Sequence, residues 1–76
     1  MNLSTKFPLE RPERAANWKR LTPREQQVAE LLFQGFINKE SAAAMGLSMK
    51  TVELHRKNVM LKMQATSVAD LVRLLT

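Results

Sequence analysis

The sequence predicts an all-α domain arranged as a four-helix bundle, and three observations support this fold class. Apolar residues recur at spacings of three and four from Leu21 onward, as they do along one face of an α-helix. Helix start and stop signals punctuate the same region at short intervals. No segment sustains the apolar–polar alternation of a β-strand. The length of 76 residues agrees, since it provides for one small core only.

The first of the four helices follows a capping box formed by Thr22, Pro23 and Glu25. A threonine at the N-cap and a glutamate three residues later can each satisfy a free backbone N–H, and proline suits the first helical position. Gly35 is expected to end this helix. Its apolar face consists of residues at helical spacing: Val28, Leu31, Leu32 and Phe36.

The second and third helices follow each other with almost no linker. Asn38 is the predicted N-cap of a short helix over residues 39–45, and Gly46 closes it by supplying the positive φ that a tight turn needs. Ser48 then caps a longer helix from Met49 to about Met63, which is expected to turn Val52, Val59 and Met63 inward. A short helix, a glycine turn and a longer helix are typical of a helix-turn-helix unit.

The fourth helix is predicted to begin after Ser67, which is a good N-cap, with Asp70 at the third position after the cap. Its apolar residues are Leu71, Val72, Leu74 and Leu75.

The chain is expected to divide near Leu21. Residues 1–20 hold two prolines and five basic residues against two acidic ones, with no convincing periodicity before Ala15. We therefore predict a basic flexible tail or linker over 1–20, with Trp18 docked on the core, and a folded domain over 21–76. A minor-groove arm is an alternative role for the tail.

Composition excludes several kinds of site. The chain has no cysteine and a single histidine, His55, so neither a disulfide framework nor a histidine–cysteine metal cluster can form. We expect no metal, no cofactor, no small-molecule substrate and no enzymatic activity. No apolar run approaches the ~20 residues of a membrane span, and no signal peptide is visible, so a cytoplasmic protein without a membrane partner is expected.

The net charge of +5 favours an anionic partner, and the third helix is its most basic element. Glu53, Leu54 and Lys57 fall on the face opposite the inward residues, where they match cytosine, a thymine methyl group and guanine respectively. We predict these three as contacts to bases of double-stranded DNA. The residues predicted to contact phosphates lie around them: Lys39, Ser48, Lys50, Thr51, His55, Arg56 and Lys62.

The residues from Leu21 to Leu75 resemble the LuxR-type helix-turn-helix family, and most closely its FixJ/NarL branch of two-component response-regulator output domains. The matching positions occur in the family's order and spacing: Leu21 to Glu25, Gly35, Asn38 to Glu40, Leu47-Ser48, Thr51-Val52, His55 and Lys62-Met63.

The resemblance implies that the third helix enters the major groove of DNA and that the third, fourth and seventh residues from Thr51 face bases. It also implies a homodimer on DNA through the last helix, here around Leu71, Val72 and Leu75. Three departures from the family pattern stand out. Ile37 precedes Asn38 where a small or polar residue is more usual. Ser41 replaces a large aliphatic residue, which is expected to loosen packing of the second helix, and the acidic Glu53 often has basic counterparts.

We therefore expect the DNA-binding domain of a bacterial transcription regulator, of the response-regulator output type. A receiver domain does not fit in 76 residues, so the chain is either the excised output domain of a longer regulator or a stand-alone protein. Two alternatives stay open. The domain could resemble the fourth region of a sigma factor and act through RNA polymerase. It could also be a protein-interaction module, which the exposed Leu54 and Leu61 and the acidic Glu53 favour, whereas Lys50, Lys57 and Lys62 oppose it.

Overall fold

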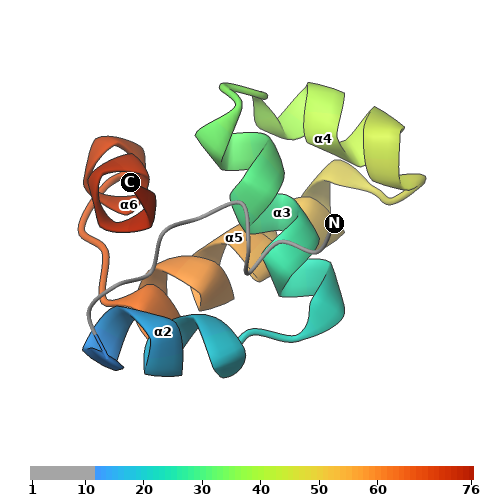
Figure 1. The fold of residues 1–76 in the computed structure, drawn as a ribbon. Coiled ribbons are helices and arrows are strands. Elements are labelled where there is room, and N and C mark those ends of the chain that lie inside the picture. Colours follow the sequence, from blue (N-terminus) through green and yellow to red (C-terminus); the bar gives the residue numbers. More distant parts are fainter. Residues whose placement is uncertain (1–11) are drawn as a thin grey trace.

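Five helices form the part of the chain that the computed structural model describes, residues 12–76 (Figure 1). No strand occurs within these residues, and the predicted all-α fold is confirmed. The helices carry the labels of Figure 1: α2 (Pro12–Lys19), α3 (Pro23–Phe33), α4 (Asn38–Met45), α5 (Met49–Met63) and α6 (Val68–Leu75).

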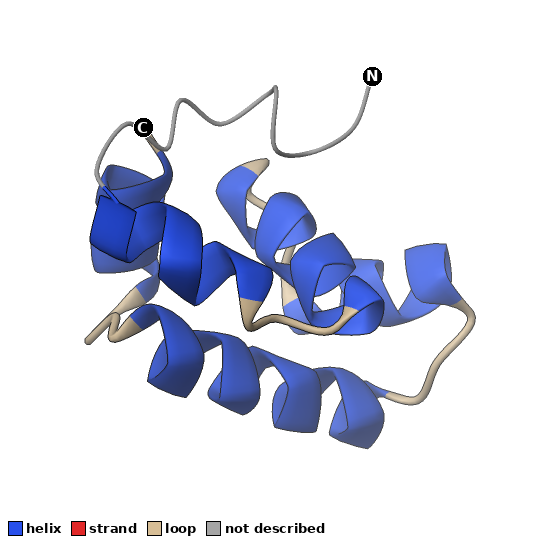
Figure 2. Ribbon diagram, turned by 60° about the horizontal axis from the view of Figure 1, so that its bottom comes forward, coloured by secondary structure: helices blue, strands red, loops and turns tan. Residues whose placement is uncertain are grey.

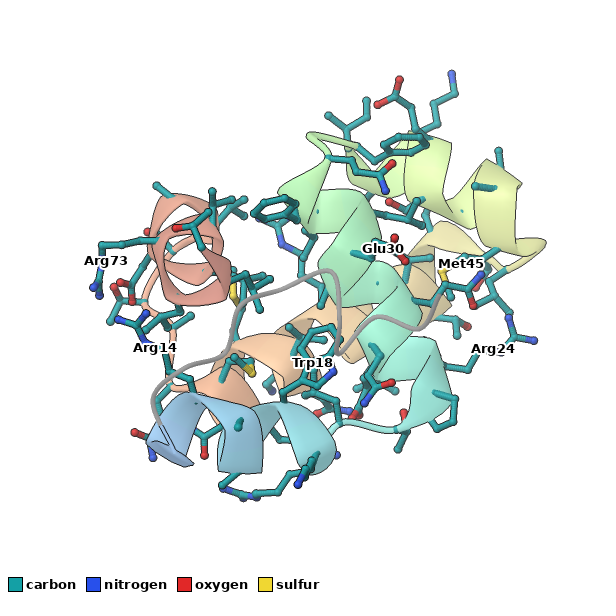
Figure 3. All side chains as sticks on the ribbon, viewed as in Figure 1. Arg14, Trp18, Arg24, Glu30, Met45 and Arg73 are labelled. Carbon is teal, nitrogen blue, oxygen red and sulfur yellow. The ribbon has the colours of Figure 1, made fainter. Side chains whose placement is uncertain are left out.

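Helix α2 lies in the segment that was expected to be a flexible tail or linker, of which residues 1–11 lie outside the described residues. The side chain of Trp18 is 3% exposed, and Figure 3 shows it pointing from α2 toward α3 and α5. Its carbonyl accepts a hydrogen bond from Nε2 of Gln26 at 3.3 Å. Trp18 is buried on the core, as predicted, and the helix that contains it packs there as well. One large aromatic ring supplies the apolar area that the segment otherwise lacks.

Three of the four predicted N-caps are confirmed. The Glu25 N–H donates to the Thr22 hydroxyl at 3.2 Å, and the Thr22 N–H donates to the Glu25 carboxylate at 2.9 Å. The hydroxyl of Ser48 accepts from the Thr51 N–H at 3.1 Å, and that of Ser67 accepts from the Asp70 N–H at 3.0 Å. These bonds satisfy donors that have no partner within their own helix, and so set where each helix begins.

The fourth predicted cap was wrong by one residue. Ile37 is the N-cap of α4, and its N–H donates to the carboxylate of Glu40 at 2.9 Å. Asn38 is the first residue inside the helix, and its side-chain oxygen accepts instead from Nη1 of Arg56 on α5 at 3.3 Å. An interhelical bond has thus replaced the local cap, while Glu40 satisfies the backbone.

The α4–α5 turn forms as predicted. Gly46 has φ +66° and closes α4 in the left-handed region, where a residue without Cβ is favoured. Its N–H bonds back to the carbonyl of Ala43. Only Leu47 and Ser48 then separate the turn from α5, so the two helices cross as a helix-turn-helix pair (Figure 1).

The core lies where α3 and α5 pack together, covered by α2 and α6. The predicted inward residues of α5 are nearly inaccessible: Val52, Val59 and Met63 are 1%, 0% and 2% exposed. From α3, Val28 and Leu32 are buried and Leu31 is half-buried, as is Phe36, which lies beyond the end of the helix.

The structure places two of the three residues predicted for the dimer contact in the core of the single chain. Leu71 and Leu75 are 0% and 1% exposed and belong to the core of the single chain. A short helix with one strongly apolar face stabilises its own domain first, because burying that face offsets the cost of ordering the chain. Of the three residues assigned to the dimer, only Val72 retains partial exposure.

Ser41 carries a buried hydroxyl with no hydrogen-bond partner in the described residues. Its side chain is 1% exposed, on the short helix α4, which packs on α5. A buried polar group without a partner costs about 1–3 kcal/mol. The α4–α5 unit therefore contains an unfavourable contact where the family resemblance places an aliphatic residue.

Leu71→Ala is expected to lower the free energy of unfolding by about 2–5 kcal/mol, because it leaves a cavity in the core. The control Val72→Ala removes apolar surface that is already partly exposed and should cost about 1 kcal/mol or less. Urea unfolding followed by circular dichroism measures both. A Leu71→Ala protein as stable as the wild type, but with weaker self-association, would place Leu71 in a dimer contact after all.

Ser41→Ala is expected to raise the free energy of unfolding by about 1 kcal/mol, since it removes an unsatisfied buried hydroxyl. Ser48→Ala makes the same chemical change at a hydrogen-bonded N-cap and should lower it by about 1 kcal/mol. Chemical denaturation of the two variants in parallel compares them directly. A destabilising Ser41→Ala would mean that this hydroxyl has a partner in solution.

Candidate nucleic-acid interface

Helix α5 borders one side of the domain, with its inner face on the core and its outer face open (Figure 2). The open face carries residues from four successive turns of the helix. Leu54 and Leu61 are 57% and 66% exposed and lie two turns apart on this face. Its members are Lys50, Glu53, Leu54, Lys57 and Leu61, all exposed.

The three residues predicted to contact bases, Glu53, Leu54 and Lys57, all lie on this open face. Together they offer a carboxylate acceptor, an apolar group and an ammonium donor, spaced over one turn. Those groups complement the cytosine amino group, the thymine methyl group and the guanine acceptors of the major groove. The opposite side of the same turns is held by Val52 and Val59, so the orientation of the open face is set by the core.

Three of the residues predicted to contact phosphates, Lys39, Ser48 and Lys50, lie at the starts of α4 and α5 and are exposed. Ser48 also donates its hydroxyl proton to Oγ1 of Thr51 at 2.9 Å. This bond leaves the Thr51 hydroxyl proton free to point outward to an anion. Helix N-termini present N–H groups and a partial positive charge, so these ends suit phosphate oxygens.

His55 and Arg56 are half-buried on the sides of α5. Arg56 is tied to the start of α4 through its bond to Asn38, on the side of α5 that faces α4. Its guanidinium has further donors beyond that single bond, so it can position α4 and still meet a phosphate.

Lys62, another predicted phosphate contact, forms an ion pair inside the fold. Its Nζ lies 2.7 Å from Oε1 of Glu25, and the two side chains are 30% and 5% exposed. The pair joins the first turn of α3 to the last turn of α5. The two residues lie 37 positions apart, so no local pattern indicates their pairing. Lys62 thus has an acidic partner within the fold, and its phosphate contact stays a prediction.

The Glu25 carboxylate combines two functions. It closes the capping box of α3 and accepts the charged hydrogen bond of Lys62. Burial alone would raise the pKa of this carboxyl. Hydrogen bonds from Lys62 and the Thr22 backbone, with the positive charge of Lys62, outweigh burial and hold the pKa below its ordinary value.

Sequence reasoning missed the apolar side of the interface. Ile37 and Met49 are 61% and 47% exposed, and they line a groove of about 470 Å³ together with Phe36, Arg56 and Val68. A second groove, of about 560 Å³, lies between α5 and the start of α6. Its lining includes Glu53, Lys57, Leu61, Thr66 and Val68. The exposed apolar residues beside the predicted N-cap were the available signal.

Neither a metal centre nor a membrane span is found where the chain is described. Over residues 12–76, no three acidic or histidine side chains are grouped closely enough to hold an ion. Over the same residues, no helix has the length and apolar character needed to cross a bilayer.

Comparison with known proteins gives one consistent result. The family described as "Bacterial regulatory proteins, luxR family" matches residues 19–75. The tetrathionate response regulatory protein TtrR of Salmonella typhimurium is 50% identical over 56 residues, which cover 74% of this chain and 27% of that protein.

Two solved structures are also similar. Full-length FixJ from B. japonicum has a TM-score of 0.75 and 48% identity, over 82% of this chain and 30% of FixJ. The response regulator StyR has a TM-score of 0.79 and 40% identity, over 82% of this chain and 31% of StyR. The chain thus spans less than a third of the length of each of these relatives.

Lys62→Met is expected to lower the free energy of unfolding at neutral pH by about 2 kcal/mol, because Glu25 stays buried without its cation. A lowered folded-state pKa means that the pair stabilises the fold above the carboxyl's unfolded pKa, about 4.3. This contribution is lost as the pH falls through the folded pKa. Denaturant unfolding from pH 3 to pH 8 should show the two proteins converging at the acid end.

Lys57→Met is the matched control, since Lys57 lies on the same helix but is exposed. It should change stability by about 0.5 kcal/mol or less, with no dependence on acid pH. If Lys62→Met behaves like this control, the ion pair contributes nothing to the fold.

Proposed function

The chain belongs to the luxR family of bacterial regulatory proteins, as a DNA-binding domain that regulates transcription and not as an enzyme, and from this we propose how it reads DNA. Helix α5 enters the major groove of double-stranded DNA. Glu53, Leu54 and Lys57 contact base edges there, while the starts of α4 and α5 hold phosphates.

The observation that carries this proposal is the open face of α5. A surface helix that serves only the fold exposes polar residues and keeps its leucines inside. Here Leu54 is 57% exposed between the charged residues Glu53 and Lys57. Mixed donor, acceptor and apolar groups on one helical face have the chemistry of base readout, whereas a purely basic face would bind any sequence equally.

The phosphate contacts in this proposal come from both helices of the helix-turn-helix unit. Exposed cations, hydroxyl groups and the half-buried side chains beside them would fix the register of α5 on the duplex. The residues proposed for this role are Lys39, Ser48, Lys50, Thr51, His55 and Arg56.

We also propose that the domain works as a homodimer on two half-sites about one helical turn apart. With Leu71 and Leu75 in the core, a contact through α6 would use its outer side. That side offers the exposed Ala69 and Arg73 and the half-buried Val72. Such a contact is small, so pairing is expected on DNA and weak without it.

The whole protein's role is proposed from its relatives. TtrR is named a response regulatory protein and StyR a response regulator, and each is more than three times the length that this chain matches. We propose that the domain is the output part of a two-component regulator, acting in the cytoplasm where bacterial DNA lies.

A second candidate function is supported by the apolar grooves beside α5. Leu61 is 66% exposed and lines one groove, and Ile37 is 61% exposed and lines the other. Such surfaces suit a protein partner, including RNA polymerase. A domain of this kind would keep its fold and its partner when the base contacts are removed.

Lys57→Ala tests the base contact. Selection from a random duplex pool should enrich a two-fold repeated motif with the wild type, and Lys57→Ala should alter one position of it. On the selected site binding should weaken by about 1–3 kcal/mol, and much less on random DNA. Fluorescence anisotropy on both duplexes measures the difference.

Leu61→Ala is the control, because Leu61 shares the open face and is absent from the proposed base contacts. It should leave the enriched motif unchanged. Equal weakening on both duplexes with Lys57→Ala would make Lys57 a phosphate contact. Selection with no enriched motif at all would contradict sequence-specific binding and favour the protein-partner function.

A further inference from the structure

Three exposed basic residues surround the connection between α2 and α3, and we call them the basic corner: Lys19, Arg20 and Arg24. Figure 3 shows Arg24 projecting away from the ribbon of α3. Within residues 12–76, none of the three forms an ion pair. Exposed cations without an acidic partner raise the local positive potential, and such a potential attracts an anion.

The basic corner is a rigid part of the domain. Trp18 and Leu21, which flank the first two of its residues, are 3% and 5% exposed and belong to the core. The backbone between them is closed by hydrogen bonds of 3.1 Å from the Arg20 N–H to the Asn17 carbonyl and from the Leu21 N–H to the Trp18 carbonyl. The backbone that carries Lys19 and Arg20 is therefore fixed on the surface of the domain.

The same corner lies against one side of α5. Glu25 follows Arg24 directly and is 2.7 Å from Lys62, which places the first turn of α3 beside α5. Helix α2 packs on α5, and Figures 1 and 2 both show them as neighbours. The corner therefore lies beside the last turns of α5.

The two sides of α5 differ in whether their basic side chains are paired with an acidic one. On the side toward α4, Arg56 and Lys39 are available to an anion. On the side toward α3, the cation of α5 is Lys62, and Glu25 neutralises it. The major groove is bordered by a phosphate backbone on each side of an inserted helix. The basic corner supplies the positive charge that the second side otherwise lacks.

From these observations we infer that Lys19, Arg20 and Arg24 bind the DNA phosphate backbone on the side of α5 opposite to α4. The inference rests on the proposed function, since it needs α5 in the groove. It extends the interface beyond the helix-turn-helix unit to a helix that precedes it. These residues touch phosphates, so they add affinity without changing the sequence that is read.

The test is the salt dependence of binding by the whole chain. Anisotropy titrations over a series of salt concentrations use the selected duplex and a scrambled duplex. Removing one phosphate-binding cation should flatten the slope of log K against log salt by about 0.9. Arg20→Gln should flatten it by that amount, and the triple change K19Q/R20Q/R24Q by about 2–3. Both duplexes should be affected equally, with the enriched motif unchanged.

Arg14→Gln is the matched control, because it removes one arginine charge from the first turn of α2, outside the corner and outside the proposed DNA and dimer contacts. It should leave the slope nearly as in the wild type, and R20K should retain the wild-type slope. Thermal unfolding confirms that each variant is folded.

The outcomes separate the two claims. If the wild type binds its selected site but Arg20→Gln and Arg24→Gln behave like Arg14→Gln, the corner does not touch DNA and only this inference fails. If the wild type binds no duplex, the proposed function fails and the inference with it. If the triple variant keeps its slope but no longer supports transcription with purified polymerase, the corner is a protein-binding surface, which also overturns the inference.

Discussion

The placement of α5 depends on the hydrogen bond and the ion pair that the buried carboxylate of Glu25 forms. It accepts the N–H of Thr22 at 2.9 Å and the ammonium of Lys62 at 2.7 Å, so one side chain both starts α3 and holds the end of α5. A buried charge is tolerated only when it is paired and hydrogen-bonded, and these partners meet that condition. Because α3 and α5 form the main packing interface, their relative rotation decides which residues of α5 remain outside.

The two ends of α5 are held by different chemistry. Ser48 caps its start within the helix itself, whereas Lys62 ties its last turn to another helix. Between them, Val52 and Val59 fill the core while Lys57 and its neighbours stay exposed. Stability and recognition therefore use opposite faces of one helix. Residues on the open face can change to suit a different DNA sequence without disturbing the fold.

Helix α2 enlarges the domain beyond the four helices that the pattern predicts. Trp18 and Leu21 complete the core, and the charged residues beside them stay at the surface. In contrast, the unpartnered hydroxyl of Ser41 leaves the short helix α4 less favourably packed on α5. Helix α5 is thus packed more favourably against α3 than against α4. The exposed Ile37 also lies on the α4 side.

Local chemistry was enough to predict the helix caps at Thr22, Ser48 and Ser67, the glycine turn and the outward direction of Glu53, Leu54 and Lys57. Each depends on residues within a few positions of one another, and the helical period relates the buried and exposed faces directly. The family resemblance added the fold and the class of partner. Contacts between residues distant in the sequence decided the rest. Lys62 pairs with Glu25, Asn38 accepts a hydrogen bond from Arg56, and Leu71 is buried in the core. A lysine or a leucine at a helix surface has the same local pattern whether its partner is a phosphate, another chain or its own fold, because only the packing of the other helices determines which partner is within reach.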